Sequence, residues 1–247
     1  MALIKAFALF AMATLTAAFS AHAETWRISA LDWPPYSSPQ EKNGGSAVAA
    51  LRASLAKIGV ILEIDYMSFP RAKALAKSGQ YIGYFPAWPE EIIEGFKGSR
   101  PIMMSQVGVV HRQDSSVSWR NTHDLFENYP VGYVRSFVYP IEIQEEVEHH
   151  ATTATGVDTE QDLVRMLAAG RIEVAVTDPS VMLRISEKMG ISGLVANKYI
   201  LFRKPLVLAF SGDRDNVSRR VRLNTVLPQF SRNQLTCCAY HPPAKQN

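Results

Sequence analysis

Short apolar runs alternate with amphipathic stretches along nearly the whole chain, and this alternation restricts its fold more than any other feature. The first pair is typical: residues 25–31 predict a strand, and the segment after Gly45 places apolar residues at helical spacing up to a stop at Gly59. Further strands are expected at residues 60–66, 81–85, 105–112, 131–134, 171–178 and 203–211, with helices between most of them. This order predicts an α/β fold.

The strands and helices form two series, followed by one more strand and one more helix. We therefore expect two lobes, with residues 24–110 and 204–247 in lobe 1 and residues 111–203 in lobe 2. The chain would cross near Val110 and return near Arg203. In the last helix, within residues 213–227, we expect Val217, Val221 and Leu227 to face inward.

The first 23 residues have the pattern of a secretory signal peptide. Lys5 precedes a short apolar run rich in alanine and threonine, and Ala21-His22-Ala23 forms a small-x-small cleavage site. The alternative, an uncleaved anchor, is disfavoured because the run is short and only weakly apolar. We predict cleavage between Ala23 and Glu24 and a periplasmic protein.

The charge balance gives little support for a nucleic-acid partner. Loss of residues 1–23 removes one lysine, so the formal charge of +3 falls to +2. Arg214, Arg219, Arg220 and Arg222 form a local basic cluster, which we interpret as a solvated helix face rather than a nucleic-acid site.

The two cysteines, Cys237 and Cys238, are adjacent and near the C-terminus. Neighbouring cysteines bridge only through a strained ring, and the chain has no third cysteine to accept either one. We expect no structural disulfide, and the two thiols have no assigned role.

Two loops that follow predicted strands combine aromatic residues with prolines. The first is LDWPPY, which supplies Asp32, Trp33 and Tyr36, and the second is YFPAWP, which supplies Phe85 and Trp88. Since loops at the carboxyl ends of strands line the ligand crevice of open α/β sheets, we predict an aromatic-walled site. The alternative is that these rings pack on their own lobe and Asp32 caps a turn.

The second lobe offers polar residues at equivalent positions. Tyr133, Arg135 and Ser136 follow one strand, where a cation and a hydroxyl beside a helix start form a candidate anion site. Asp178 ends another strand and precedes Pro179, so it is a candidate both for a helix N-cap and for a carboxylate that binds an ammonium group.

Signals for catalysis, metal or cofactors are weak. The chain lacks GxSxG, HExxH, CxxC, a P-loop and GxGxxG in a suitable setting. His149 and His150 are adjacent, so they point to different faces of a helix, and we interpret this segment as a solvated acidic helix rather than a metal site.

Four segments in order, DWPPY, FPRAKALAKSGQYIGYF, PEE…GSRPI and LAAGRIEVAVTD, resemble the bacterial extracellular solute-binding proteins of family 3. The resemblance covers essentially the whole mature chain. It implies a type II-like periplasmic binding protein with two lobes, two crossing hinge strands and a ligand enclosed by hinge closure. In this family Asp32 and Tyr36 match first-loop positions, and Asp178 matches the acid that holds a ligand's α-ammonium group.

The chain departs from the family pattern at one position. Amino-acid binders in this family carry an arginine for the ligand carboxylate, and the matching position here falls within residues 90–93, at Ile92. An aliphatic side chain makes no bidentate carboxylate contact. We expect Arg71 or Arg135 to face the cleft and supply the missing cation.

These features predict a monomeric, non-catalytic protein without cofactors that binds a small polar, amino-acid-like solute and delivers it to an ABC-type transporter permease. One alternative is a ligand-sensing domain for a membrane receptor. The other is a small-acid lyase on the same fold, with Asp32 or Asp178 as the general acid.

Overall fold

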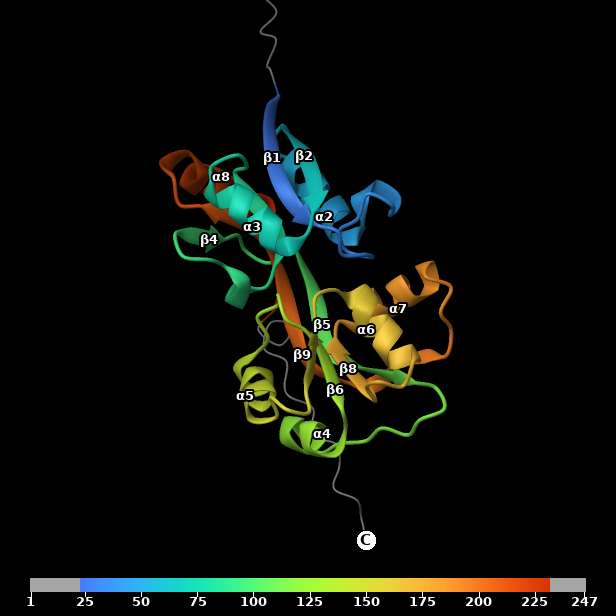
Figure 1. Ribbon diagram of the computed structural model, residues 1–247. Coiled ribbons are helices and arrows are strands. Elements are labelled where there is room, and N and C mark those ends of the chain that lie inside the picture. Colours follow the sequence, from blue (N-terminus) through green and yellow to red (C-terminus); the bar gives the residue numbers. More distant parts are fainter. Residues whose placement is uncertain (1–22, 232–247) are drawn as a thin grey trace, which may run out of the picture.

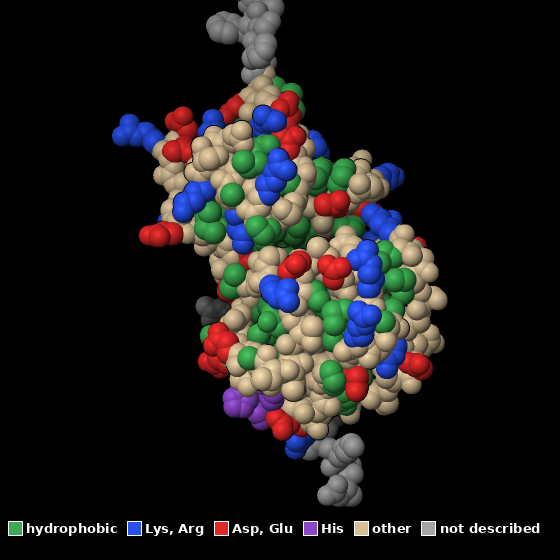
Figure 2. Space-filling model, viewed as in Figure 1, with side chains coloured by type: hydrophobic (Ala, Val, Ile, Leu, Met, Phe, Trp, Pro, Cys, Tyr) green, Lys and Arg blue, Asp and Glu red, His purple; other side chains and the backbone are tan. Residues whose placement is uncertain are grey.

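The computed structural model describes residues 23–231, which form two α/β lobes joined by two long strands (Figure 1). Residues 1–22 of the predicted signal peptide and both cysteines lie outside the described residues. Within residues 23–231, no helix combines the length and the apolar character needed to cross a membrane. Figure 2 shows charged and hydrophobic side chains gathered along the boundary between the lobes.

Lobe 1 is a twisted sheet covered by helices. Its elements are β1 (Glu24–Leu31), η1 (Lys42–Gly44), α2 (Ser46–Ala56), β2 (Val60–Met67), α3 (Phe69–Lys77), β3 (Gly83–Ala87), η2 (Pro89–Glu91), β4 (Phe96–Gly98) and α8 (Arg214–Val226). β1 pairs in parallel with β2 and β3. The side chains of Trp26, Ile28 and Ala30 in β1 are fully buried, as expected for a strand with neighbours on both edges and helices on its faces.

Lobe 2 repeats the same strand and helix alternation. It contains α4 (Thr122–Asn128), β6 (Val131–Val134), α5 (Ile141–His149), β7 (Thr155–Val157), α6 (Glu160–Ala168), β8 (Val174–Thr177) and α7 (Pro179–Lys188). β6 pairs in parallel with β7 and β8. The carboxyl ends of these strands face lobe 1, so the loops that follow them, including Phe137 and Asp178, reach the boundary.

The two lobes share the strands β5 (Met103–Arg112) and β9 (Leu194–Ser211). These strands pair antiparallel from Met103 opposite Leu206 to Arg112 opposite Leu194. β5 also pairs with β8 of lobe 2, and the last part of β9 pairs with β3 and β4 of lobe 1. The predicted two-lobed α/β fold with two crossing strands is confirmed, while the boundaries at residues 110 and 203 stay predictions.

The inward face predicted for the last helix is wrong at two positions. Val217 and Val221 are 44% and 54% exposed, because α8 packs through Asn216 and Leu223 instead. Leu227 is buried, directly after the helix. The arginines nearby have structural partners: Arg219 and Arg222 donate to the Glu24 carboxylate at the start of β1.

Candidate functional site

Six aromatic side chains, which we call the aromatic cluster, fill the space between the lobes: Trp33, Tyr36, Phe69, Trp88, Phe137 and Tyr139. Phe137 of lobe 2 lies against lobe 1, with its ring centroid 6.2 Å from that of Trp33 and 5.8 Å from that of Trp88. Edge-on contacts of this kind add to the stabilisation from burial alone. The predicted aromatic residues Trp33, Tyr36 and Trp88 therefore lie together, and Phe137 of the opposite lobe packs against them.

Two hydrogen bonds link the first loop of lobe 1 to buried carboxylates of lobe 2. Trp33 Nε1 donates to Glu160 Oε1 over 2.6 Å, and the Tyr36 hydroxyl donates to Asp178 Oδ2 over 3.0 Å. We call this pair of bonds the interlobe clamp. Because each bond joins residues of different lobes, the clamp belongs to a closed arrangement.

An ion-pair group reinforces the clamp at the edge of the interface. Glu41, in the loop after Tyr36, accepts from Arg184 Nε over 2.8 Å and lies 2.9 Å from Lys188 Nζ. Both cations lie on α7 of lobe 2. They hold the pKa of the Glu41 carboxyl below its usual range.

Asp178 has one of the two roles that its sequence position offered, that of the N-cap of α7, and its second oxygen binds other groups of the protein. Its Oδ1 accepts from the backbone N–H groups of Ser180 and Val181 and caps α7, while its Oδ2 accepts from the Gln106 N–H and from Tyr36. The side chain is fully buried, and this burial raises its pKa. Because the carboxylate accepts hydrogen bonds from these four groups, the protein itself binds it in this closed arrangement.

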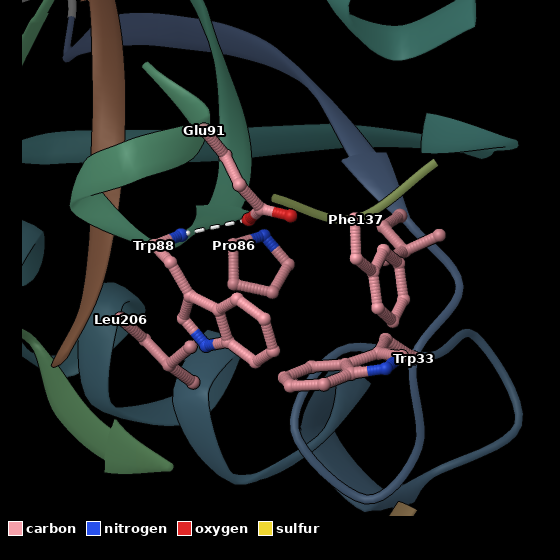
Figure 3. Close-up of a pocket in the computed structure, with 7 residues that line it drawn as sticks. Trp33, Pro86, Trp88, Glu91, Phe137 and Leu206 are labelled. Atoms are coloured by element: carbon pink, nitrogen blue, oxygen red, sulfur yellow. Dashed lines mark hydrogen bonds between the residues drawn. The ribbon is translucent and has the colours of Figure 1, made fainter. Parts of the chain in front are cut away.

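A small cavity lies inside the aromatic cluster (Figure 3). Its volume of about 10 Å³ is at the lower limit for a single water molecule. It is lined by Leu31, Trp33, Pro86, Trp88, Glu91, Phe137 and Leu206. Trp88 is held in place by its Nε1, which donates to Ser105 Oγ of β5 over 2.9 Å.

The acid in this cavity is Glu91, at the end of η2. Its carboxylate accepts the Trp88 backbone N–H over 2.9 Å. Burial raises the pKa of Glu91 to about 7, opposed by that hydrogen bond and by the charges of Lys73 and Lys204. A carboxyl group with this pKa is partly protonated at neutral pH and is able both to donate and to accept a hydrogen bond.

Glu160, at the start of α6, has a similar environment. It is 7% exposed, and burial raises its pKa to about 7 against the opposing hydrogen bond from Trp33. Since Trp33 belongs to the other lobe, closure itself contributes to this burial.

The mouth of the cleft forms a larger pocket, about 530 Å³ in volume, lined by both lobes. This is within the range of small-molecule sites, about 300–1,000 Å³. Lobe 1 supplies Leu31, Asp32, Met67, Ser68, Phe69 and Pro70, and lobe 2 supplies residues 134–137 and 158–161. Arg135 donates to Asp158 Oδ1 over 2.7 Å, so its charge is already paired.

The structure places seven of the ten predicted site residues in the mouth pocket, the small cavity or the clamp. Asp32, Arg135 and Ser136 line the mouth pocket, Trp33 and Trp88 line the small cavity, and Tyr36 and Asp178 form one bond of the clamp. Phe85 is fully buried and Tyr133 packs on Tyr139, and neither lines these cavities. Arg71 is exposed and lines neither cavity, so Arg135 is the predicted cation that reaches the cleft.

Sequence reasoning missed Glu91, Glu160 and Phe137. The position that carries the carboxylate-binding arginine in the family was assigned to Ile92. In the structure Ile92 points toward Gly98, and the side chain in the cavity is Glu91. An acid close to Trp88 in a proline-containing loop was the sequence feature that could have indicated Glu91. No sequence feature indicated Glu160 or Phe137, because the burial of these side chains depends on the opposite lobe.

Replacing Glu91 by glutamine should change how stability depends on pH. The raised pKa means that the folded protein keeps the proton while the unfolded chain loses it, so the wild type loses stability as pH rises from about 4.5 to about 7. We expect its free energy of unfolding to fall by roughly 3 kcal/mol relative to Glu91→Gln across that window. Urea unfolding at several pH values measures this, with exposed Glu63→Gln as control. Parallel profiles for wild type and Glu91→Gln would contradict the assignment.

Comparison with known proteins gives matches among solved structures. No protein-family model matches the chain, and no curated protein matches it. A histidine kinase sensor domain with similarity to periplasmic binding proteins is 19% identical, with 81% of this chain and 87% of that chain covered and a TM-score of 0.68. An ancestral arginine-binding protein bound to arginine is 18% identical, with 82% and 90% covered and a TM-score of 0.64.

A third structure, the GluR0 ligand-binding core in complex with L-glutamate, is 15% identical, with 83% of this chain and 93% of that chain covered and a TM-score of 0.65. Together these matches show that the chain has the two-lobed fold that the family 3 resemblance implied. The three structures are a sensor domain, an arginine-binding protein and a ligand-binding core.

Proposed function

We propose that this chain, which has the two-lobed fold of periplasmic binding proteins, captures a small, polar, amino-acid-like solute between its lobes by hinge closure. The observation that carries the proposal is the interlobe clamp, since Trp33–Glu160 and Tyr36–Asp178 join residues far apart in the chain across the cleft. The mouth pocket, lined from both lobes, supplies a volume that suits a small molecule.

The charges around the cleft favour a ligand with a cationic group. Asp32, Glu91, Asp158 and Glu160 line the two cavities, whereas Arg135 is the only cation among the described lining residues and is paired with Asp158. The nearby Lys204 is paired with Glu90. Carboxylates and aromatic rings together suit an ammonium or guanidinium group.

A ligand screen on protein that has been unfolded and refolded to remove bound solutes tests this proposal. Arginine, lysine and a diamine serve as cationic probes, with glutamate and succinate as anionic comparators. A ligand at about a hundred times its dissociation constant should raise the melting temperature by about 5–10 °C. A response to the dicarboxylates alone would contradict the preference for cations, and no response to any probe would contradict amino-acid-like binding.

Affinity for the cationic ligand should rise with pH. Glu91 and Glu160, both with a pKa of about 7, must ionise to pair with a cation, so affinity should fall on the order of tenfold per pH unit below 7 if one of them pairs with it. Glu160→Gln should weaken binding by about ten- to a hundredfold at pH 8, while exposed Glu173→Gln should leave it unchanged. Titration calorimetry from pH 5.5 to 8 gives both values. Affinity independent of pH would show that neither acid takes part.

The closed, ligand-bound form has two candidate membrane partners. We propose delivery to an ABC-type permease in the inner membrane after export through the predicted signal peptide. The likeness to a histidine kinase sensor domain favours a membrane receptor as the second candidate. Uptake of the labelled ligand by cells with and without this chain distinguishes the two, because only delivery makes uptake depend on it.

A further inference from the structure

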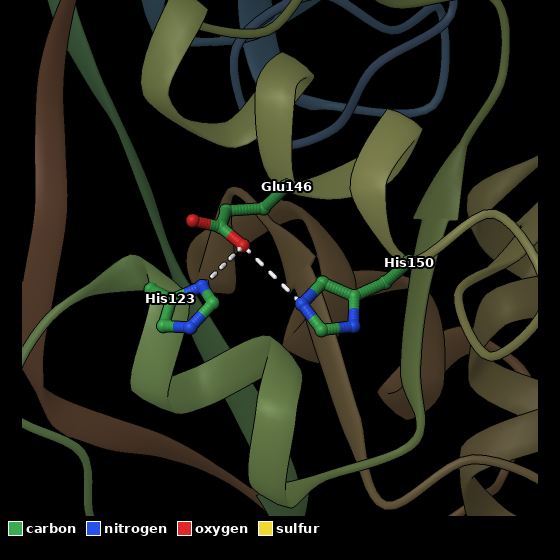
Figure 4. Close-up of side chains that lie close together, drawn as sticks. All are labelled: His123, Glu146 and His150. Atoms are coloured by element: carbon green, nitrogen blue, oxygen red, sulfur yellow. Dashed lines mark hydrogen bonds and ion pairs between the residues drawn. The ribbon is translucent and has the colours of Figure 1, made fainter.

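We propose that lobe 2 binds a divalent metal ion of the Zn²⁺ class through His123, Glu146 and His150, which we call the histidine site (Figure 4). The site lies on α4 and α5, at the end of lobe 2 away from the cleft (Figure 1). The proposal is therefore independent of the ligand site between the lobes.

The three side chains converge from two helices. Glu146 and His150 are four residues apart at α5 and share one face of it, and His123 faces them from α4. His123 Nδ1 lies 3.1 Å and His150 Nε2 lies 3.4 Å from Glu146 Oε2. Ligands about 2.0–2.1 Å from a tetrahedral Zn²⁺ are about 3.3 Å apart, so these separations suit such an ion.

The donor set is chemically suited to such a metal. Two imidazoles with one carboxylate are a known ligand set for zinc, with a fourth position left for water or another group. Imidazole nitrogen also favours zinc, copper or nickel over the hard cations Mg²⁺ and Ca²⁺.

The environment of His150 Nε2 gives further support. This nitrogen is buried and makes no hydrogen bond to the described residues, although it lies 3.4 Å from Glu146 Oε2, within ion-pair distance. A buried nitrogen without a hydrogen bond destabilises the fold, and a metal ion bound to it would satisfy it.

The surroundings offer a fourth ligand and a route of access. Glu127 follows His123 by four residues on α4, and its Oε2 lies 3.9 Å from His150 Nε2. An open groove beside it, about 500 Å³ in volume, is lined by Glu127 and His150. Figure 2 shows histidine side chains at the surface of this part of lobe 2.

The adjacent pair His149 and His150 does not indicate the histidine site in the sequence. His149 and His150 do not act as a pair, because only His150 joins Glu146 and His123 within a group whose ligand atoms are all within 4.8 Å of one another. The missing ligand comes from a helix more than twenty residues earlier, which no local spacing indicates.

Zn²⁺ titration of the full chain, produced without a histidine tag, tests the proposal. Cys237 and Cys238 are replaced by serine in every sample so that thiolates do not bind the metal. We expect one Zn²⁺ per chain by calorimetry. His123→Gln and Glu146→Gln should each weaken binding at least about tenfold, whereas His111→Gln, in β5, should leave it unchanged.

His123→Gln is the variant least expected to disturb folding, because the His123 side chain is 59% exposed. Circular dichroism of each variant checks this. No Zn²⁺ binding by the starting protein, or an affinity in His123→Gln and Glu146→Gln equal to that of the starting protein, would overturn the proposal. Co²⁺ is a second probe: a visible spectrum typical of nitrogen and oxygen ligands, lost in Glu146→Gln, is the expected result.

Discussion

Replacing Trp33 by alanine should lower the free energy of unfolding by about 3–5 kcal/mol. The indole is 3% exposed, contacts Tyr36, Trp88 and Phe137, and donates the bond that satisfies Glu160. Its removal leaves a cavity at the interface of the lobes and a buried acid without its donor. Urea unfolding followed by far-ultraviolet circular dichroism measures the loss.

Two control variants separate packing from hydrogen bonding at Trp33. Trp33→Phe keeps a ring but loses the N–H, and should cost about 1–3 kcal/mol. Ile61→Ala, at a side chain that is 52% exposed, should cost less than about 0.5 kcal/mol. If Trp33→Ala costs no more than Ile61→Ala, the aromatic cluster is not part of the stable core.

The double variant Trp33→Phe with Tyr36→Phe should shift the equilibrium from closed to open lobes by a factor of about 10² to 10⁴. Each variant removes one bond of the interlobe clamp to a buried carboxylate, and hydrogen bonds to charged groups contribute about 1.5–3 kcal/mol each. Small-angle X-ray scattering should record a larger radius of gyration for the double variant without ligand.

Tyr129→Phe provides the matched control for this experiment. The Tyr129 hydroxyl also makes two hydrogen bonds, but both are to the backbone of Ser118 within lobe 2. Its loss should leave the radius of gyration unchanged. If the double variant and this control scatter alike, the clamp does not determine how the lobes are arranged.

The alternation of apolar and amphipathic segments was enough to predict most of the fold. The expected strands at residues 25–31 and 60–66 differ from β1 and β2 by one residue at an end, and Gly59 and Gly79 end their helices with φ values of 68° and 82°. β4 and β7 were missed because each has three residues, too few to show a period of two.

The site could be predicted only in part. Aromatic residues beside prolines after a strand mark Trp33, Tyr36 and Trp88 within one lobe. Their partners come from the other lobe, where Glu160 has the ordinary appearance of an acid in the first turn of a helix. Burial at an interface between lobes depends on how the lobes meet, which single-sequence patterns do not encode.

The shared strand β9 also sets the order in which the protein is assembled. Lobe 1 takes β1, β2 and β3 from the start of the chain, yet β3 has no partner on its outer edge until Val207–Phe210 of β9 has been synthesised. The β6, β7 and β8 strands of lobe 2 are all made before that point. A nascent chain thus carries an unpaired strand edge for about half of its synthesis, the kind of surface that promotes aggregation and that chaperones protect.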